Sequence, residues 1–265
     1  MRANRRGHLV GWLGLALFGI PLVALVTQAF ATRWFFPDLV PGELTTGMFG
    51  RVVGDSATHA AVADSLIVGL AVTAAALVLA IPAARALALG STRHAPLIVT
   101  LMLVPTVLPP LALAMGLNVA LLRTDLAGSL GAVVVSHLVV ALPFAVLLLA
   151  AAFTRYDTGY ERQAQALGAS DARIILRVFL PLAIPAILVT GALVFVVSWG
   201  QYLLTLLPGG GRVVSVPVLL MAAASGGNPT ATAVLALVAA VPPAVAVLVV
   251  VRHLDRLGAP RTVAR

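Results

Sequence analysis

The side chains that could do chemistry in this sequence are few, and most of them interrupt long apolar stretches. They are Asn118, His137, Ser198 and Gln201. A hydrolytic site would need a serine that faces a base, but Ser136 and His137 are consecutive, and such neighbours do not face each other on a helix. His137 has no second metal ligand at a suitable spacing, so we expect it to satisfy a local hydrogen bond. The sequence thus predicts neither a catalytic site nor a metal site.

Two absent residue types restrict the chemistry further. The sequence has no cysteine, which excludes disulfides, thiolate metal sites and thiol nucleophiles. It has no lysine either, and a P-loop needs its lysine to reach the β- and γ-phosphates of ATP. We therefore expect a chain that is not an enzyme and holds no cofactor. If ATP drives its activity, ATP and Mg²⁺ must be bound by a partner ATPase subunit.

The composition indicates the surroundings of these residues. Of 265 residues, 61% are hydrophobic and 10% are charged, whereas soluble domains carry about 25% charged residues. All 17 basic residues are arginine, and the net charge is +8. Nucleic-acid binding would need a basic stripe on a soluble face, but these arginines lie between apolar blocks. The sequence predicts an all-α polytopic membrane protein. We expect it to lie in the lipid bilayer and not to bind nucleic acid.

Six stretches are long enough to cross a bilayer, for which about 20 mostly apolar residues are needed. They are Val10–Phe30, Ser65–Leu87, Pro96–Leu121, Leu130–Phe153, Pro181–Leu207 and Thr230–Val251. Basic residues are retained on the cytoplasmic side of a membrane. With both termini in the cytoplasm, 13 arginines lie inside and four outside. The outer four are Arg33, Arg51, Arg123 and Arg212. This distribution predicts that both termini are cytoplasmic.

The first span has an alternative interpretation. Met1–His8 is rich in arginine, an apolar run follows, and Ala29 and Ala31 could mark the cleavage site of a signal peptide. The apolar run of 21 residues is longer than the roughly 7–15 residues of a signal core. A retained helix is therefore the favoured interpretation.

Prolines interrupt the third span at Pro105, Pro109 and Pro110. Each removes a backbone donor and bends its helix, and bent helices in transporters line cavities. We expect this cluster to bend the third span beside a pathway. For Pro143 in the fourth span and for Pro242 and Pro243 in the sixth, a bend and the general tolerance of proline in membrane helices are equally good interpretations.

The longest predicted cytoplasmic segment, Arg155 to Leu180, separates the fourth and fifth spans. Tyr160, Ala164 and Leu167 recur at helical spacing and form one apolar face. Gly168 stands where a helix end needs a flexible residue. The pattern predicts a short helix and a glycine corner.

A second helix is expected to follow, because Ser170 or Asp171 can cap it. Its apolar face would hold Ile174, Ile175, Val178 and Phe179. This helix would lead directly into the fifth span.

The segment resembles the EAA loop of binding-protein-dependent ABC permeases, whose pattern is roughly E-A-A-x-x-x-G followed by an apolar helix and L-P. The matching residues are Ala164, Leu167, Gly168, Ala169, Ser170, Leu180 and Pro181. Similar stretches are VPTVLPPLALAMGLN in the third span, SHLVVALPFAVLLL in the fourth and VVSWGQYLLTLL in the fifth. The resemblance covers about residues 65–251 and implies a type I, MetI-like fold, with residues 1–265 as one permease domain.

The resemblance implies that the first helix of the loop docks into a cleft of the ATPase subunit. The residues expected to couple the two subunits are Tyr160, Glu161, Arg162, Ala164, Leu167, Gly168, Ala169 and Ser170. Arg162 stands where the family usually has glutamate, and Glu161 lies one position early, about 100° round the helix. Either Glu161 reaches the same partner, or the polar contact differs.

The resemblance also implies a translocation pathway lined by the fifth span. The candidate pathway residues are Asn118, Ser198, Gln201 and Tyr202. Interhelical hydrogen bonding is the alternative role for such polar side chains. A secondary transporter would instead place ionisable residues near the membrane midplane, and no aspartate, glutamate or arginine lies near the centre of a predicted span.

By resemblance, the chain is an importer subunit of the bacterial cytoplasmic membrane. Its expected partners are an ATPase dimer, a second permease subunit and an extracytoplasmic solute-binding protein. The departure at Arg162 mildly favours an unlike second permease over a second copy. Length and outer loops look most like the spermidine and putrescine branch, so the first expectation is a small, polar, polyamine-like solute.

Overall fold

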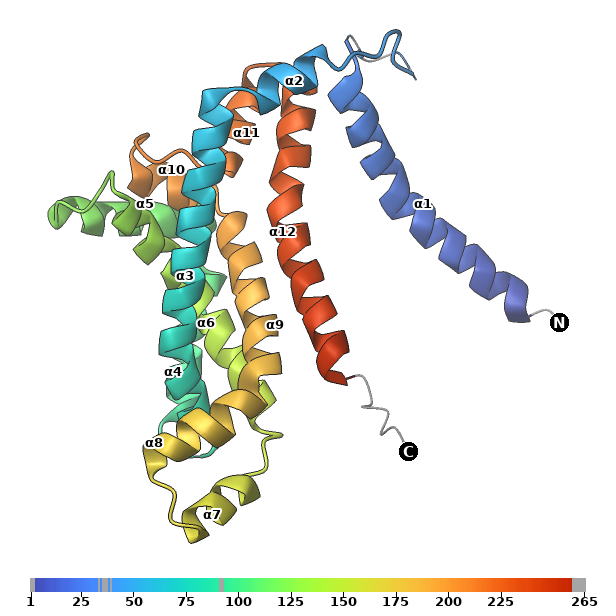
Figure 1. The fold of residues 1–265 in the computed structure, drawn as a ribbon. Coiled ribbons are helices and arrows are strands. Elements are labelled where there is room, and N and C mark those ends of the chain that lie inside the picture. Colours follow the sequence, from blue (N-terminus) through green and yellow to red (C-terminus); the bar gives the residue numbers. More distant parts are fainter. Residues whose placement is uncertain (1–2, 33, 35–37, 39, 91–92, 259–265) are drawn as a thin grey trace. The chain divides into compact units, whose positions relative to one another are not determined.

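The computed structural model describes residues 3–32, 34, 38, 40–90 and 93–258, and for residues 3–15, 18, 257 and 258 it describes the backbone alone. The described residues form helices and one isolated antiparallel bridge, Ala31 to Leu44 (Figure 1). The elements are α1 (Ala3–Phe30), α2 (Gly47–Val53), α3 (Ser56–Ala88), α4 (Ala95–Val107), α5 (Pro110–Arg123), α6 (Leu130–Phe153), α7 (Gly159–Ala166), α8 (Asp171–Ile174), a π-helical turn η1 (Ile175–Phe179), α9 (Leu180–Trp199), α10 (Leu203–Gly209), α11 (Val216–Ser225) and α12 (Pro229–Gly258).

The chain divides into two compact units. Unit 1 comprises Met1–Val62 with Val216–Pro242, and unit 2 comprises Ala63–Ser215 with Pro243–Arg265. In unit 1, the end of α1 packs with α2 and the beginning of α12. Phe30 stacks on Phe49 with ring centroids 5.3 Å apart, so the short outer helix α2 is anchored by an aromatic contact.

The core of unit 2 is built from small side chains. Ala76, Ala80 and Ala84 recur every four residues on α3, are fully buried and join Ala141 and Ala145 of α6 in one apolar cluster. Small residues at such contacts let the backbones of membrane helices approach closely. A small residue also lies at the contact between α3 and α9.

Gly69 marks that contact. A Cβ at Gly69 would lie 2.8 Å from Cε2 of Phe195 on α9, and real Cβ atoms cannot approach a carbon so closely. Glycine is therefore required where α3 meets α9.

The predicted bend of the third span is confirmed. Helices α4 and α5 meet at Leu108 and Pro109 with an angle of 103° between them. Pro143, by contrast, lies inside the continuous helix α6. Proline alone therefore does not break these helices, and neither does an adjacent pair, because Pro242 and Pro243 lie inside the continuous helix α12.

The predicted fifth span, Pro181–Leu207, is wrong as a single helix. Helix α9 ends at Trp199, Gly200 follows as its C-terminal cap, and α10 begins at Leu203. Helix α10 then packs against α5 and α6. The break places Gln201 and Tyr202 in a non-helical connection.

Among the described residues, four helices are long and apolar enough to cross a membrane, or five when the bent pair α4 and α5 counts as one span. They are α3, α6, the run Asp171–Trp199 and the run Pro229–Arg256. Within the predicted first span, the longest run of residues with described side chains is the short apolar helical stretch Gly19–Phe30. Arg33 lies outside the described residues. The six-span count and the cytoplasmic termini stay predictions.

Candidate functional site

The segment between α6 and α9 contains the predicted short helix and glycine corner. Helix α7 closes with two backbone hydrogen bonds, from Gly168 N–H to the Gln165 carbonyl at 2.9 Å and from Ala169 N–H to the Ala164 carbonyl at 3.0 Å. This is the Schellman arrangement, which needs a left-handed residue just past the helix. Gly168 has a φ of +79°. The corner is therefore set by its backbone conformation.

Beyond the corner, the second helix differs from the prediction. Ser170 stands at the N-cap position of α8, but its side chain makes no capping hydrogen bond. After four residues the α-helix widens into the π-helical turn η1, which leads into α9. Single π-turns are frequent at functional sites.

The π-turn changes which side chains are buried. Ile174 and Phe179 are buried, whereas Ile175 is 41% exposed. The predicted common apolar face of these residues is therefore wrong. The predicted face assumed a regular α-helix, whereas Ile175 begins the π-helical turn.

One ion pair ties the loop to α3. Arg85, in the last turn of α3, donates from Nη1 to Glu161 Oε1 at 2.8 Å and from Nη2 to Oε2 at 2.7 Å. The carboxylate of Glu161 is thus held from within the chain, on the buried side of α7. The sequence analysis missed Arg85, because one arginine at the end of an apolar span satisfies the topology rule and signals no partner.

An aromatic cluster surrounds this pair. The Arg85 Cζ lies 4.4 Å from the centroid of the Phe179 ring, a cation–π contact. Phe153 and Tyr156 meet Phe179 edge-on, with centroids 5.0 and 5.3 Å away. The pair therefore joins α3, α7, η1 and the end of α6 in one cluster.

The electrostatics of the cluster favour an ionised carboxylate. Hydrogen bonding to Arg85 lowers the pKa of Glu161 below its usual value. Burial raises the pKa of the Tyr156 phenol to about 12, and the neighbouring Glu161 carboxylate adds to the effect. The Tyr156 hydroxyl is close enough to influence Glu161, but it is not aligned for a hydrogen bond with any described residue. At neutral pH the cluster thus holds one Arg⁺–Glu⁻ pair and a neutral phenol.

Other side chains of α7 and of the corner that follows it are exposed. Leu167 is 88% exposed and Tyr160 is 53% exposed, and Arg162, Gly168 and Ser170 are exposed as well. In Figure 1, α7 lies at the end of unit 2, beyond α8. Large apolar side chains at such a place usually mark an interaction surface.

A second polar group lies buried between α6, α9 and α10. His137 Nδ1 is 2.9 Å from Ser198 Oγ, and His137 Nε2 is 3.0 Å from Thr205 Oγ1. The Thr205 hydroxyl donates to the Gln201 carbonyl at 2.8 Å. Its hydrogen is therefore used, so Nε2 must donate to Thr205, and in the neutral ring Nδ1 accepts from Ser198.

This junction contradicts the expected local hydrogen bond of His137, because its partners lie 61 and 68 residues away. The adjoining cavity measures about 10 Å³ and is also lined by Ser65, Trp199 and Ser215. That is room for one water molecule. Ser198 thus lies in a closed junction in this conformation.

The other candidate pathway residues are accessible to different degrees. Asn118 on α5, and Gln201 and Tyr202 between α9 and α10, are half-buried. Their role in solute passage stays a prediction.

Comparison with known proteins shows the family of this chain. The sequence profile of the family described as binding-protein-dependent transport system inner membrane component matches residues 76–259. The molybdenum transport system permease protein ModB of Mycobacterium tuberculosis is 30% identical over 214 residues, which cover 76% of this chain and 77% of the relative. The sulfoquinovosyl glycerol transport system permease protein SmoH of Agrobacterium fabrum is 27% identical over 191 residues, which cover 71% of this chain and 65% of the relative, just under two thirds.

The fold also matches solved structures. A bacterial ABC transporter involved in the import of the acidic polysaccharide alginate has a chain with a TM-score of 0.74 and 16% identity, covering 96% of this chain and 98% of that one. At this identity the likeness shows the fold alone, and it confirms the predicted all-α permease architecture. The chain therefore belongs to the binding-protein-dependent transport system inner membrane components, the non-catalytic, multi-pass permease subunits of ABC importers in the cytoplasmic membrane.

Proposed function

We propose that α7 and its glycine corner dock on a separate ATPase subunit and transmit its closure to the membrane helices. One observation carries this proposal: Tyr160 of α7 and Leu167 at its C-cap are exposed, while Glu161, about 100° round the helix from Tyr160, is fastened to α3. Exposed apolar side chains favour burial by a partner. The fastening makes α3 follow any displacement of α7.

The route of this motion has two branches. Through Glu161 and Arg85 it reaches α3, and through Phe179 it reaches η1 and α9. The ATPase subunits bind ATP and Mg²⁺, and their closure moves α7. Residues 1–265 act as one permease domain and supply half of the translocation pathway.

Two further partners complete the proposed importer. A solved bacterial alginate ABC transporter, whose chain matches with a TM-score of 0.63 and 17% identity, is in complex with an alginate pentasaccharide-bound periplasmic protein. That complex supports delivery of solute to this permease by a solute-binding protein. A second permease subunit supplies the other half of the pathway, and Arg162 at the family's glutamate position favours an unlike partner.

The relatives give no support to a polyamine as substrate. The names of three similar permeases refer to sulfoquinovosyl glycerol, molybdenum and trehalose. We therefore propose a polar, uncharged or anionic solute. Stimulation of ATP hydrolysis by molybdate, by trehalose and by spermidine, each with the cognate binding protein, distinguishes these classes.

The coupling proposal is tested with two glycine variants of the purified importer. Gly168→Asp places a charged side chain at the corner. Gly90→Asp is the matched control, because Gly90 has a φ of +68° and, like Gly168, nothing within 4 Å of an added Cβ. We expect Gly168→Asp to abolish solute-stimulated ATP hydrolysis and binding of the ATPase, and Gly90→Asp to retain both.

Equal losses in both variants would show that backbone strain, and not docking, is responsible. Full stimulated hydrolysis in Gly168→Asp would show that the corner does not meet the ATPase. Either result would remove the main support for α7 as the coupling helix.

A further inference from the structure

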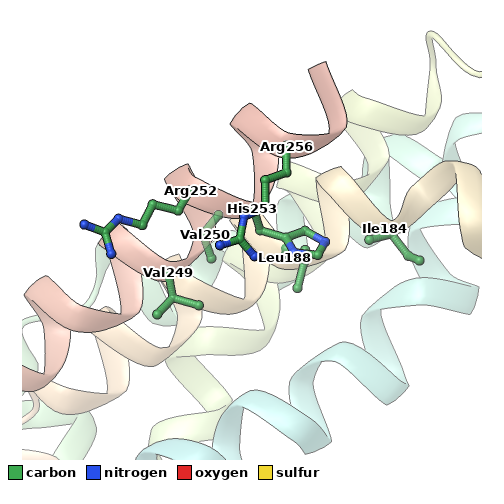
Figure 2. Close-up of a pocket in the computed structure, with 7 residues that line it drawn as sticks. All are labelled: Ile184, Leu188, Val249, Val250, Arg252, His253 and Arg256. Carbon is green, nitrogen blue, oxygen red and sulfur yellow. The ribbon is translucent and has the colours of Figure 1, made fainter. Parts of the chain in front are cut away.

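A larger cavity lies between α9 and the last turns of α12, within unit 2. Its volume is about 540 Å³, a size typical of ligand sites, which range from about 300 to 1,000 Å³. It is lined by Ile184, Leu188, Val249, Val250, Arg252, His253 and Arg256 (Figure 2). None of these residues belongs to the cluster around Glu161 or to the junction at His137.

The lining combines aliphatic and basic side chains. Four of the seven residues are aliphatic and three are basic. Figure 2 shows His253 and Arg256 beside Leu188, with Arg252 extending outward from α12. This combination suits a molecule with an apolar body and an anionic head.

The positive charge of the cavity is not compensated nearby. Among the described residues, neither Arg252 nor Arg256 forms an ion pair with a carboxylate. Asp255, the acidic residue on the same turn, is exposed and does not line the cavity. An anion that enters would therefore meet two free guanidinium groups, whose planar forks bind phosphate bidentately.

The cavity also lies at the depth where acyl chains give way to headgroups. The apolar run of α12 ends at Val251, and Arg252, His253 and Arg256 follow it. From Val249 to Arg256 the helix rises by about 10 Å. The headgroup region on each side of the hydrocarbon core is about 5–8 Å thick, so aliphatic and basic linings match the two layers.

We propose that this cavity binds an anionic phospholipid. The phosphate lies between Arg252 and Arg256, and one acyl chain runs along Leu188, Ile184 and Val249. A free anion would leave the aliphatic lining empty. A protein surface packed here would have to desolvate two unpaired arginines, whereas a lipid supplies the compensating charge. The proposal is independent of the coupling role of α7.

The test measures which lipid the purified importer complex retains. Native mass spectrometry after exchange into micelles of phosphatidylglycerol and phosphatidylcholine with the same acyl chains gives the ratio of the two bound lipids. We expect phosphatidylglycerol to be retained preferentially. Arg252→Gln and Arg256→Gln should each lower the ratio about fivefold, and the double variant about 25-fold, from about 1 kcal/mol for each arginine near a lipid surface.

Two controls separate the cavity from general surface charge. Arg173→Gln with Arg177→Gln removes two exposed arginines that do not line the cavity, and the ratio should not change. Leu188→Trp fills the aliphatic part of the cavity while both cavity arginines remain, and it should reduce the retention of phosphatidylglycerol. If general surface charge held the lipid, the Arg173→Gln, Arg177→Gln variant would lower the lipid ratio, and Leu188→Trp would leave the retention of phosphatidylglycerol unchanged.

Three results would overturn the proposal. The first is an unchanged lipid ratio in the Arg252→Gln, Arg256→Gln double variant. The second is displacement of the lipid by inorganic phosphate, which would indicate a site for free anions. The third is a disulfide between Val249→Cys of this chain, which has no natural cysteine, and a cysteine introduced into the second permease subunit, which would show that the second subunit covers this face.

Discussion

The guanidinium group of Arg85 holds the carboxylate of Glu161 through two hydrogen bonds of 2.8 and 2.7 Å, across 76 residues of chain. Their side chains are 24% and 12% exposed, so the pair is only partly hydrated. Bidentate geometry and partial burial distinguish it from an ordinary surface ion pair. The contact fastens the loop helix α7 to the last turn of α3.

Breaking this pair is expected to cost stability and coupling together. Glu161→Gln and Arg85→Gln should each lower the free energy of unfolding by about 1–3 kcal/mol, since each leaves a partly buried charge without its partner. Both should also raise the ATP hydrolysed per solute transported. Thermal unfolding in detergent and transport in proteoliposomes measure the two effects.

The exposed neighbour Arg162 provides the control. Arg162→Gln removes a charge from the same helix without touching the pair, and its melting temperature should match that of the parent. In a double-mutant cycle, the losses from Arg85→Gln and Glu161→Gln should not add. Additive losses would mean that the two residues act independently.

The pair also predicts how stability depends on pH. The pKa of Glu161 is lowered from its usual 4.5 by its hydrogen bonds with Arg85. A lowered pKa in the folded state gives stability that is complete above the usual pKa and is lost as the pH falls through the lowered one. The difference in melting temperature between the parent and Glu161→Gln should be constant from neutral pH to about pH 5 and should narrow in more acidic solution. A difference that changes between pH 7 and 6 would contradict this assignment.

His137 is predicted to hold the break between α9 and α10. His137→Leu leaves the hydroxyl groups of Ser198 and Thr205 without their shared partner, which should cost about 1–3 kcal/mol and loosen the connection at Gln201. The labelling rate of a single Gln201→Cys reporter by maleimide should therefore rise in the His137→Leu background.

Ser136→Ala is the matched control for this experiment. Ser136 is equally buried and neighbours His137, but its hydroxyl bonds only to the Ala132 carbonyl of its own helix at 2.8 Å. Its removal should leave the labelling rate unchanged. If both variants raise the rate equally, general loosening of α6 explains the result.

The parts of this structure that follow from local sequence were predictable. The spacing of Tyr160, Ala164 and Leu167 before Gly168 specifies a helix and its end, because a Schellman closure involves only neighbouring residues. The cluster of Pro105, Pro109 and Pro110 likewise indicated the bend of the third span, because each proline removes a local backbone donor.

Long-range partners were not predictable in the same way. Nothing near Arg85 indicates Glu161, and nothing near His137 indicates Ser198 or Thr205, because the helices that bring them together are placed by tertiary packing. The π-turn at Ile175–Phe179 and the break at Gly200 were not predicted either. Neither Arg177 within the turn nor Ser198 and Gln201 beside the break is specific for a change of helical geometry, and periodicity alone reports hydrophobicity rather than helical pitch.

The predicted orientation can be tested at single positions, because the natural chain contains no cysteine. Leu167→Cys lies at the exposed corner of the loop, and Leu126→Cys lies in the turn between α5 and α6, where Leu126 is 49% exposed. The arginine distribution places the first in the cytoplasm and the second outside. In intact cells, a membrane-impermeant maleimide should label Leu126→Cys and spare Leu167→Cys. In inside-out vesicles the pattern should reverse, and bound ATPase should protect Leu167→Cys. Labelling of Leu167→Cys from outside would invert the topology and remove α7 from the reach of a cytoplasmic ATPase.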